Sequence, residues 1–177
     1  MAAQFEEGRI VKELSTIGYE GAALEDFLET LKLFKVDVLL DVRELPISRR
    51  KGFSKKALSE ALAEVGISYQ HERCLGSPKV MRHELRESWD YERFFLQFND
   101  HLKEQHGKIE ELAEELRGHI ALLCFERNHT QCHRTPVAEK FSEATGIKPR
   151  HIGVQDRAQR QRYKNQSSNS RKSLSTA

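Results

Sequence analysis

Several features that would place this 177-residue chain outside the globular class are missing from its sequence. No apolar run approaches the roughly 18 residues that a membrane-spanning helix requires. The longest apolar stretches are Val36–Val42 and Ile120–Phe125. The first residues, Met1–Lys12, contain acidic side chains and no apolar segment of the kind that a secretory signal carries. We therefore expect no contact with a membrane.

The chain contains few cysteines, and their number is odd. The chain has three cysteines, Cys74, Cys124 and Cys132. A disulfide scaffold normally has an even, denser set in a shorter secreted chain. The sequence therefore predicts reduced thiols and a cytoplasmic setting.

No internal repeat is visible, and no low-complexity segment precedes the last 21 residues. Hydrophobic residues make up 38% of the chain and charged residues 32%, which is enough apolar material for one core. At roughly 150 residues per domain, the length predicts one domain with some residues to spare.

The net charge of +2 is unevenly distributed. Residues 157–177 contain no acidic side chain, so the remaining residues carry a net charge of −4. This segment is also rich in serine, and it has too few apolar side chains to offset the entropy of ordering. We interpret residues 156–177 as a disordered basic tail that either keeps the protein in solution or contacts nucleic acid non-specifically. Its basic residues are Arg157, Arg160, Arg162, Lys164, Arg171 and Lys172.

Strand-like and helix-like patterns alternate along residues 13–155. Helical spacing of apolar residues is clear in Ala23–Lys35, whereas the apolar run Val36–Val42 is typical of a strand buried on both faces. The expected strands are Glu13–Gly18, Val36–Val42, Ile67–Gln70, His119–Phe125 and His151–Val154. The expected helices are Ala23–Lys35, one capped by Ser54 and running to Val65, Asp90–Glu104, Lys108–Arg117 and His133–Ala144. We expect Cys74–Ser88 to be a loop, and a break near Gly107.

Strands joined by helical crossovers pair in parallel. The sequence thus predicts an α/β fold: one three-layer domain with a mostly parallel sheet of about five strands and helices on both faces. The predicted organisation is a lead-in at residues 1–12, the domain at 13–155 and the tail at 156–177. The patterns do not fix the order of the strands.

Residues capable of chemistry follow the ends of the predicted strands. Open parallel sheets bind ligands outside the carboxyl ends of their strands, so we expect one cleft at this edge. Two features also have an ordinary structural explanation: Asp41 and Arg43 as a salt bridge, and Cys124 as a small core residue. The residues expected in the cleft are Tyr19, Asp41, Arg43, Ser48, Arg49, Cys124, Glu126, Cys132, His133 and Arg134.

The expected ligand bears a phosphate, as a nucleotide or a nucleic-acid-derived molecule does. Arg43, Arg49 and Arg134 are predicted to form a phosphate-sized pocket near a helix start, where backbone amides favour an anion. Ser48 lies in the same loop, and Tyr19, beside two glycines, is placed to stack on a base or a sugar.

An enzymatic role would use the remaining residues of this cleft. Glu126 and His133 are the expected acid–base pair, with Asp41 orienting or activating a group. Cys124 and Cys132 are candidate nucleophiles, and a helix start would favour the thiolate of Cys132. A non-catalytic nucleic-acid-binding module is the competing class of function.

A metal site is not predicted, and the sequence assigns no cofactor. Cys124, His129, Cys132 and His133 offer soft ligands. Their spacing is not that of a zinc finger or a zinc ribbon, which use a Cys-x2-Cys knuckle.

Several separated motifs occur in a recognisable order along the chain. They are Thr16–Glu20; Asp41–Arg43 with Pro46, Ser48, Arg49 and Phe53; Gly66–Tyr69; Leu75–Gly76; Leu122–Glu126; Cys132–Arg134; and His151–Ile152. This set resembles domain-of-unknown-function family 488 (DUF488) over about Ser15–Val154. The resemblance implies one compact α/β domain whose motif residues gather in a cleft, with no reaction assigned. The family usually has a second glycine after Leu75–Gly76, where this chain has Ser77.

A weaker resemblance suggests a cysteine-dependent enzyme. The segment Leu39–Glu44 is similar to the Asp-Val-Arg-Glu motif of rhodanese sulfurtransferases. In that family the cysteine directly precedes a short cradle of backbone amides, whereas nine residues separate Cys124 from Arg134 here. Neither cysteine has the Cys-x5-Arg spacing of a tyrosine phosphatase. Sulfur transfer or another cysteine chemistry is therefore the alternative to the phosphate-binding hypothesis.

Overall fold

A five-stranded parallel sheet forms the centre of the protein. This computed structural model describes residues 11–174, and the side chains of residues 11–166. The strands lie in the order β3-β2-β4-β1-β5, and every pairing is parallel. Their bounds are β1 Val11–Gly18, β2 Val38–Asp41, β3 Ser68–His71, β4 Gly118–Cys124 and β5 Arg150–Gly153. The predicted α/β fold is confirmed. The predicted lead-in lies outside the described residues, except for Val11 and Lys12, which begin β1.

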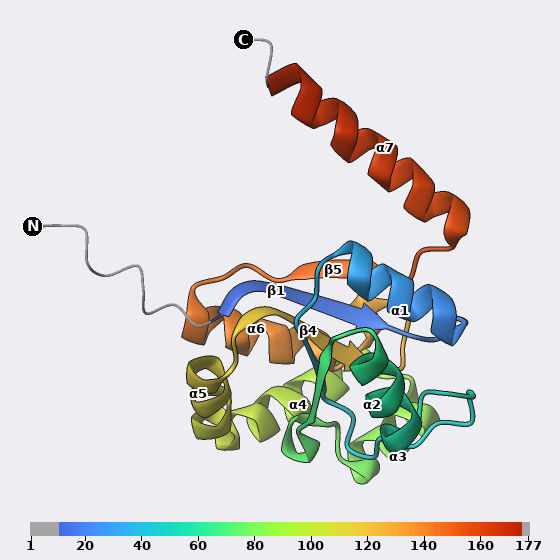
Figure 1. Cartoon of the computed structure of the whole chain (residues 1–177). Coiled ribbons are helices and arrows are strands. Elements are labelled where there is room, and N and C mark those ends of the chain that lie inside the picture. The colour runs from blue at the N-terminus through green and yellow to red at the C-terminus, as the bar shows by residue number, and fades with distance from the viewer. Residues whose placement is uncertain (1–10, 175–177) are drawn as a thin grey trace, which may run out of the picture.

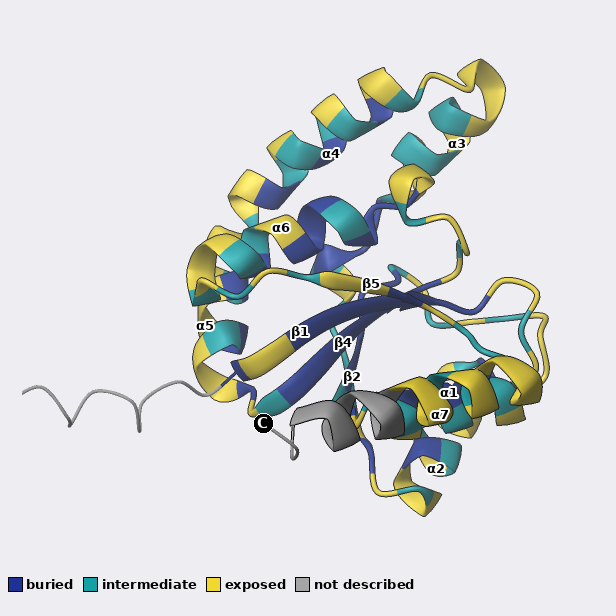
Figure 2. Cartoon of the chain, turned by 90° about the horizontal axis from the view of Figure 1, so that it is seen from above, coloured by how far each residue is buried: buried dark blue, intermediate teal, exposed yellow. Residues whose placement is uncertain are grey.

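Helices cover both faces of the sheet (Figure 1). Figure 2 shows one layer made of α4, α5 and α6 and another made of α1 and α2, with the sheet between them. The bounds are α1 Leu24–Leu33, α2 Lys55–Glu64, α4 Tyr91–Glu104, α5 His106–Glu115 and α6 Arg134–Thr145. None of the described helices is long and apolar enough to cross a membrane.

Two apolar cores follow from the alternation of side chains along the buried strands. In β4, Ile120 and Leu122 pack in the core beneath α4, α5 and α6. Ala121 and Leu123 pack in the core beneath α1 and α2. All four side chains are fully buried, which explains why this strand reads as a continuous apolar run in the sequence.

The helix starts differ from the sequence expectation in one respect. Ser54 precedes α2, but its hydroxyl donates to Ser48 O and accepts from Ser48 N, so it closes the preceding loop and does not cap the helix. Asp90 does cap α4, by accepting a hydrogen bond from Arg93 N at 3.0 Å. The break between α4 and α5 falls at Gln105, two residues before the expected Gly107.

The segment expected to be a loop, Cys74–Ser88, is mostly helical, and this expectation is wrong. It contains the end of a 3-10 helix, η1 (Arg73–Leu75), and the helix α3 (Lys79–Ser88). No residue of α3 is fully buried. Its apolar residues are Val80, Met81 and Leu85, of which Met81 packs against the core as a partly buried side chain. Polar contacts connect it to α4, because Gln97 Nε2 donates to Glu84 at 3.2 Å and Arg93 lies 3.5 Å from Glu84.

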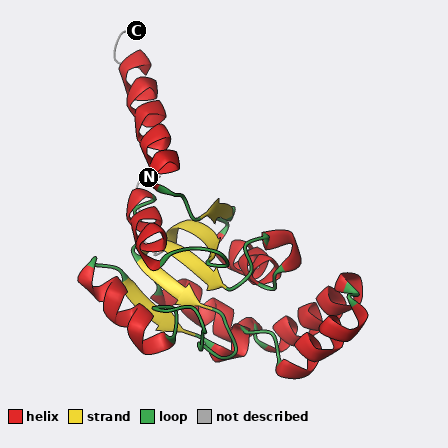
Figure 3. Cartoon of the chain, turned by 90° about the vertical axis from the view of Figure 1, so that its right-hand side faces the viewer, coloured by secondary structure: helices red, strands yellow, loops and turns green. Residues whose placement is uncertain are grey.

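The expected disordered tail forms a helix in its described part, α7 (Arg157–Leu174). Asp156 accepts a hydrogen bond from Gln159 N at 2.8 Å and caps the helix. Arg160 forms an ion pair of 2.8 Å with Asp26 of α1, and the ring of Tyr163 packs against Phe34. These contacts hold the first turns, while the rest of α7 points away from the domain (Figure 3).

The loop after β4 leads to the opposite face of the sheet from the loops after the two neighbouring strands. β4 lies between β2 and β1. The connections after β1 and β2 lead to α1 and α2 on one face of the sheet, whereas the connection after β4 leads to α6 on the other face. Loops that diverge in this way open a crevice at the carboxyl edge of a parallel sheet, which is where such sheets bind ligands.

The end of β1 contacts this loop closely. A Cβ atom on Gly18 would overlap Glu126 O in the loop after β4. Gly18 pairs in the sheet with Gly153 of β5, and a Cβ atom on Gly153 would have no neighbour within 4 Å. The absence of a side chain is therefore required at Gly18 and not at Gly153.

We predict that Gly18→Ala lowers the free energy of unfolding by about 1–3 kcal/mol, because the methyl group forces the loop after β4 away from the sheet. Gly153→Ala is the matched control and should change it by less than about 0.5 kcal/mol. Urea denaturation of the two variants measures both values. Equal stability of the two variants would contradict the close approach.

Candidate functional site

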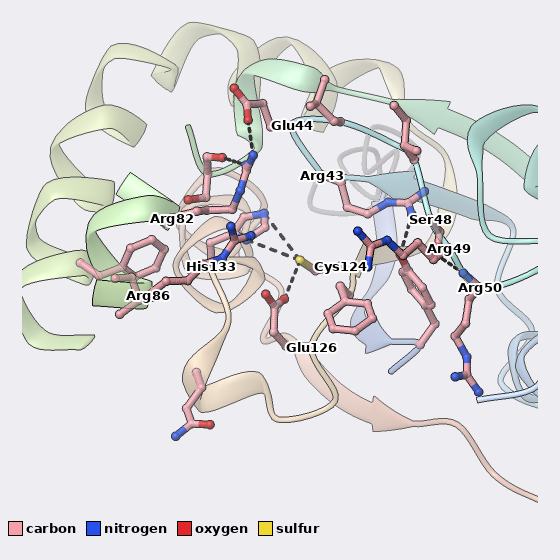
Figure 4. A pocket seen from close by; sticks show the side chains of 18 residues that line it. Arg43, Glu44, Ser48, Arg49, Arg50, Arg82, Arg86, Cys124, Glu126 and His133 are labelled. Carbon is pink, nitrogen blue, oxygen red and sulfur yellow. Dashed lines mark hydrogen bonds and ion pairs between the residues drawn. The ribbon is translucent and has the colours of Figure 1, made fainter. Parts of the chain in front are cut away.

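A cavity of about 770 Å³ opens at the carboxyl edge of the sheet (Figure 4). This volume lies within the range of roughly 300–1,000 Å³ that is typical of small-molecule sites. Its walls come from the loops after β1, β2 and β4, together with Ser77 and residues of α3 and α4. The predicted cleft residues that line it are Tyr19, Arg43, Ser48, Arg49, Cys124, Glu126 and His133.

Asp41 and Arg43 form a bidentate ion pair at the end of β2. Arg43 Nε donates to Asp41 Oδ1 at 2.8 Å and Nη2 donates to Oδ2 at 2.5 Å. Tyr69 adds a hydrogen bond of 2.6 Å to Asp41, and burial together with this bond raises the pKa of Tyr69. Both members of the pair are buried. Asp41 therefore has all its partners within the protein and is not free to activate a ligand.

The remaining nitrogen of the Arg43 guanidinium, Nη1, also has hydrogen-bond partners within the protein. Nη1 donates to the Tyr19 hydroxyl and to Phe53 O, both at 2.9 Å. Burial alone would lower the pKa of Arg43, but its bonds to Asp41 and Tyr19 outweigh burial and raise the pKa. The prediction that Arg43 binds phosphate with a free fork is not supported, because the structural salt bridge uses that fork.

Tyr19 is not available to stack on a ligand. Its ring is only 2% exposed and stacks on Phe53, with ring centroids 4.3 Å apart. Phe125 packs edge-on against the same ring and is itself 43% exposed. Phe125, which the sequence did not single out, is therefore the aromatic side chain that the cavity offers to a ligand.

Arg134 holds the loop after β4 and does not line the cavity. Its side chain is buried and donates to Glu126 O, to Arg127 O at 3.1 Å and to Thr16 Oγ1 at 3.2 Å. The guanidinium of Arg134, which was predicted to bind phosphate, thus donates its hydrogen bonds to backbone carbonyls and to Thr16. Arg43 and Arg134 are both structural, and the predicted trio with Arg49 does not form.

Two thiols and one carboxylate meet at the floor of the cavity. Cys124 Sγ and Cys132 Sγ both donate to Glu126 Oε2, at 2.9 and 3.0 Å. Both cysteines are buried. Figure 4 shows Glu126 and His133 on either side of Cys124, so the structure brings together four of the predicted catalytic residues.

His133 completes this group. Its Nε2 lies 2.7 Å from Val42 O, and because a carbonyl only accepts, Nε2 carries a hydrogen. Nδ1 lies 3.5 Å from Cys124 Sγ. Ligand atoms of these four residues lie within 4.8 Å of one another, as a metal site requires. His129 is not part of the group, because its ring stacks on His151.

The environment of the thiols opposes their ionisation. Burial raises the pKa of Cys124 and, with the neighbouring Cys124, raises that of Cys132 well above its ordinary value. Burial also raises the pKa of Glu126, but His133 and the two S–H donors outweigh it and lower the pKa. Desolvation thus opposes the Cys132 thiolate that the helix start was expected to favour. This also weakens the alternative of a cysteine nucleophile.

Four arginines besides Arg43 line the cavity, and two of them have internal partners. Arg82 pairs with Glu44 at 2.7 Å, and Arg50 Nε donates to Ala22 O at 2.8 Å. The guanidinium groups of Arg49 and Arg86 make no hydrogen bond or ion pair with any described residue. Both side chains are exposed and line the cavity. Arg86 was missed because its segment was expected to be a loop, and α3 has no fully buried residue that would have identified it as a core helix.

Ser48 shapes the loop that carries Arg49. Its backbone N donates to Ser54 Oγ at 3.1 Å, and its hydroxyl accepts from Arg50 N at 3.1 Å. Ser77 also belongs to the lining of the cavity, and its buried hydroxyl has no hydrogen-bond partner among the described residues.

Comparison with known proteins identifies the domain. A family model described as "Domain of unknown function DUF488" matches residues 23–141. The chain belongs to this family. No curated protein and no solved structure shows significant similarity to the chain. The matched range includes all the residues of the cavity in this DUF488 domain except Tyr19.

We predict that Arg43→Ala destabilises the DUF488 domain by about 3–5 kcal/mol, because it leaves the buried Asp41 carboxylate without its partner. Arg49→Ala, in the same loop but exposed and unpaired, should change the free energy of unfolding by less than about 0.5 kcal/mol. Chemical denaturation of both variants checks this difference. A stable, folded Arg43→Ala protein would contradict the structural role.

Proposed function

We propose that this protein binds a small phosphate-bearing ligand, a nucleotide or a fragment derived from nucleic acid, in the cavity at the carboxyl edge of its sheet. The observation that carries the proposal is the pair of unpartnered guanidinium groups of Arg49 and Arg86. They reach the same cavity from different elements, the loop after β2 and the helix α3. Planar guanidinium forks match the geometry of phosphate oxygens.

The charge around the cavity favours an anion. Five arginines and two glutamates line it, although the body of the chain outside residues 157–177 carries a net charge of −4. Asp41 and Glu44 neutralise the charges of Arg43 and Arg82. The other three arginines of the lining, Arg49, Arg50 and Arg86, make no ion pair with a described residue, so they supply the positive field. A low-dielectric wall strengthens such a field and raises the local concentration of anions.

The rest of the cavity suits the uncharged part of a nucleotide. Phe125, Leu45 and Ile47 line it and are partly or largely exposed, and exposed apolar side chains in a concave site support contact with a ligand. Phe125 replaces Tyr19 as the side chain proposed to contact a base or a sugar.

A reaction is a further step that this proposal does not require. Glu126 and His133, the expected acid–base pair, lie at the cavity floor beside Cys124. A ligand held by Arg49 and Arg86 would lie above these groups. The proposal therefore concerns recognition, and it stands without a catalytic role for any of the three.

We predict that Arg49→Ala and Arg86→Ala each weaken the binding of a nucleoside 5′-monophosphate about 10- to 100-fold, which corresponds to the loss of one charge-assisted hydrogen bond. Isothermal titration calorimetry at low salt measures the affinities. The parent nucleoside, which lacks the phosphate, should bind weakly and respond little to either substitution.

Two exposed basic residues outside the cavity provide matched controls. Lys51 belongs to the same loop as Arg49, and Lys79 belongs to the same helix as Arg86; neither lines the cavity. Lys51→Ala and Lys79→Ala should retain the affinity of the unmodified protein. Equal losses in these controls, or no binding of any nucleotide by folded protein, would refute the proposal.

A second candidate function is non-specific binding of nucleic acid by α7. The observation that favours it is that α7 projects from the domain (Figure 1) and contains basic but no acidic residues. Basic side chains on a projecting helix release counterions from a phosphate backbone and give affinity without sequence preference.

We predict that removal of residues 157–177 abolishes binding of long duplexes and its steep dependence on salt, because six basic residues are lost. The same truncation should leave most of the affinity for a nucleoside monophosphate intact. Fluorescence anisotropy at several salt concentrations measures the first effect and calorimetry the second. An equal loss of affinity for the duplex and for the nucleoside monophosphate would show that the cavity and α7 are not separate binding sites.

A further inference from the structure

The four residues at the cavity floor have the composition of a metal site. They are two cysteines, one glutamate and one histidine, gathered from the end of β4 and the start of α6. We propose that Cys124, Glu126, Cys132 and His133 bind one divalent transition metal ion of the Zn²⁺ class. This inference goes beyond the proposed function and does not rest on it, because it uses no arginine and no phosphate.

The donor set selects the class of metal. Zn²⁺ in proteins is bound by thiolate, imidazole and carboxylate, usually in tetrahedral geometry. Mg²⁺ and Ca²⁺ prefer sets of oxygen ligands and disfavour two thiols. Four donors of these three types, one from each residue, are the number that a tetrahedral ion takes.

The spacing of the donors fits such an ion. Zn–S bonds of about 2.3 Å and Zn–N bonds of about 2.0–2.1 Å separate the two ligands of a tetrahedron by about 3.5 Å. Cys124 Sγ and His133 Nδ1 are 3.5 Å apart. The two sulfur atoms lie somewhat nearer to Glu126 Oε2, at 2.9 and 3.0 Å, because each now makes an S–H···O hydrogen bond. Small side-chain movements therefore convert this hydrogen-bonded group into a coordination sphere.

The orientation of His133 is the second, independent observation. A histidine that binds a metal through one nitrogen almost always donates the other N–H to a carbonyl or a carboxylate. His133 does this with Nε2, which donates to Val42 O at 2.7 Å. The bond fixes the ring and directs Nδ1 toward Cys124. Arg134 N, which lies 3.5 Å from Cys132 Sγ, is placed to stabilise the charge of a bound thiolate.

The carboxylate of the group is held by few partners. Glu126 is partly buried, and within the described residues it makes no ion pair with a lysine or an arginine. Its carboxylate accepts only from the two thiols, and His133 is the cationic side chain near it. Buried carboxylates normally have a cationic partner or coordinate a metal. A divalent cation at this position would take the place of His133 as the positive charge beside Glu126.

The loop that carries the ligands is held without a metal. Arg134 donates to Glu126 O and Arg127 O, Asn128 caps the 3-10 helix η2 (His129–Gln131) by accepting from Thr130 N, and Thr135 Oγ1 donates to His129 O at 2.6 Å. The metal-free protein should therefore fold. Cys124, Glu126 and His133 line the cavity whereas Cys132 lies beneath them, so an ion can enter from the cavity.

Metal binding exchanges protons for the cation. The S–H bonds of Cys124 and Cys132 break, two metal–sulfur bonds form, and both protons pass to the solvent together with any proton on His133 Nδ1. No electron is transferred, and Glu126 binds as the carboxylate that it already is.

Cobalt substitution of the full chain tests this inference. Metal-free protein, kept reduced, is titrated with Co²⁺ while its absorption spectrum is recorded. We expect saturation at one equivalent, with a thiolate-to-cobalt charge-transfer band and the intense visible bands of four-coordinate cobalt. Zn²⁺ should then displace the cobalt and remove these bands.

Variants assign the ligands. Cys132→Ser should reduce the charge-transfer intensity by about half, since one of two thiolates is lost, and weaken metal binding by more than about 10-fold. Glu126→Gln, which keeps the shape of the side chain, should retain the charge-transfer band with a similarly weakened affinity. Cys74→Ser is the matched control and should bind like the unmodified protein, because Cys74 lies outside the group. Circular dichroism confirms that each variant is folded.

Three results would overturn the inference. One is the absence of a charge-transfer band in folded protein whose three thiols all react with a thiol reagent after unfolding. Another is weak binding with the pale spectrum of six-coordinate cobalt, which would show an adventitious surface site. The third is an equal loss of the band in Cys74→Ser, which would place the thiolate ligand elsewhere.

Discussion

The bidentate pair of Asp41 and Arg43 is the interaction on which the carboxyl edge of the sheet depends. It lies at the end of β2 with both side chains buried. Through Arg43 the same pair also holds Tyr19 from the loop after β1 and Phe53 O from the loop after β2. A buried ion pair is stable only when its remaining donors and acceptors are satisfied, and here neighbouring loops satisfy them. The walls of the cavity are thus fixed before any ligand arrives.

A second buried arginine does the same for the loop after β4. Arg134 binds two backbone carbonyls of that loop and thereby places Glu126 and the two cysteines at the cavity floor. The arginines of this edge therefore divide into two groups. Arg43 and Arg134 donate their hydrogen bonds to other groups of the protein. Arg49 and Arg86 line the cavity and have no partner among the described residues. The first pair of arginines therefore stabilises the loops, and the second pair is proposed to bind the ligand. The cluster of Cys124, Glu126, Cys132 and His133 at the cavity floor is separate from both pairs.

Much of this arrangement could be predicted from the sequence, and the failures have physical reasons. Buried parallel strands read as apolar runs, and strand ends carry the site residues, so the fold and the cleft followed directly. The sequence does not show which partner a side chain meets, so it left open whether Arg43 pairs with Asp41 or binds a ligand. In the structure Arg43 is buried and Arg49 is exposed. α3 was missed because none of its residues is fully buried; polar contacts with α4 and the partly buried Met81 hold it in place. α7 was missed because its first turns depend on Asp26 and Phe34, which are more than a hundred residues away in the chain.

The central claim is that the phosphate of a ligand meets Arg49 and Arg86, while Arg43 and Arg134 keep their internal bonds. A crystal structure of the protein with a bound nucleoside 5′-monophosphate tests this claim most directly. The account predicts phosphate oxygens within hydrogen-bond distance of the Arg49 and Arg86 guanidinium groups, with the Asp41–Arg43 pair intact. A phosphate bound by Arg43 or Arg134, or a nucleotide bound outside the cavity, would contradict it.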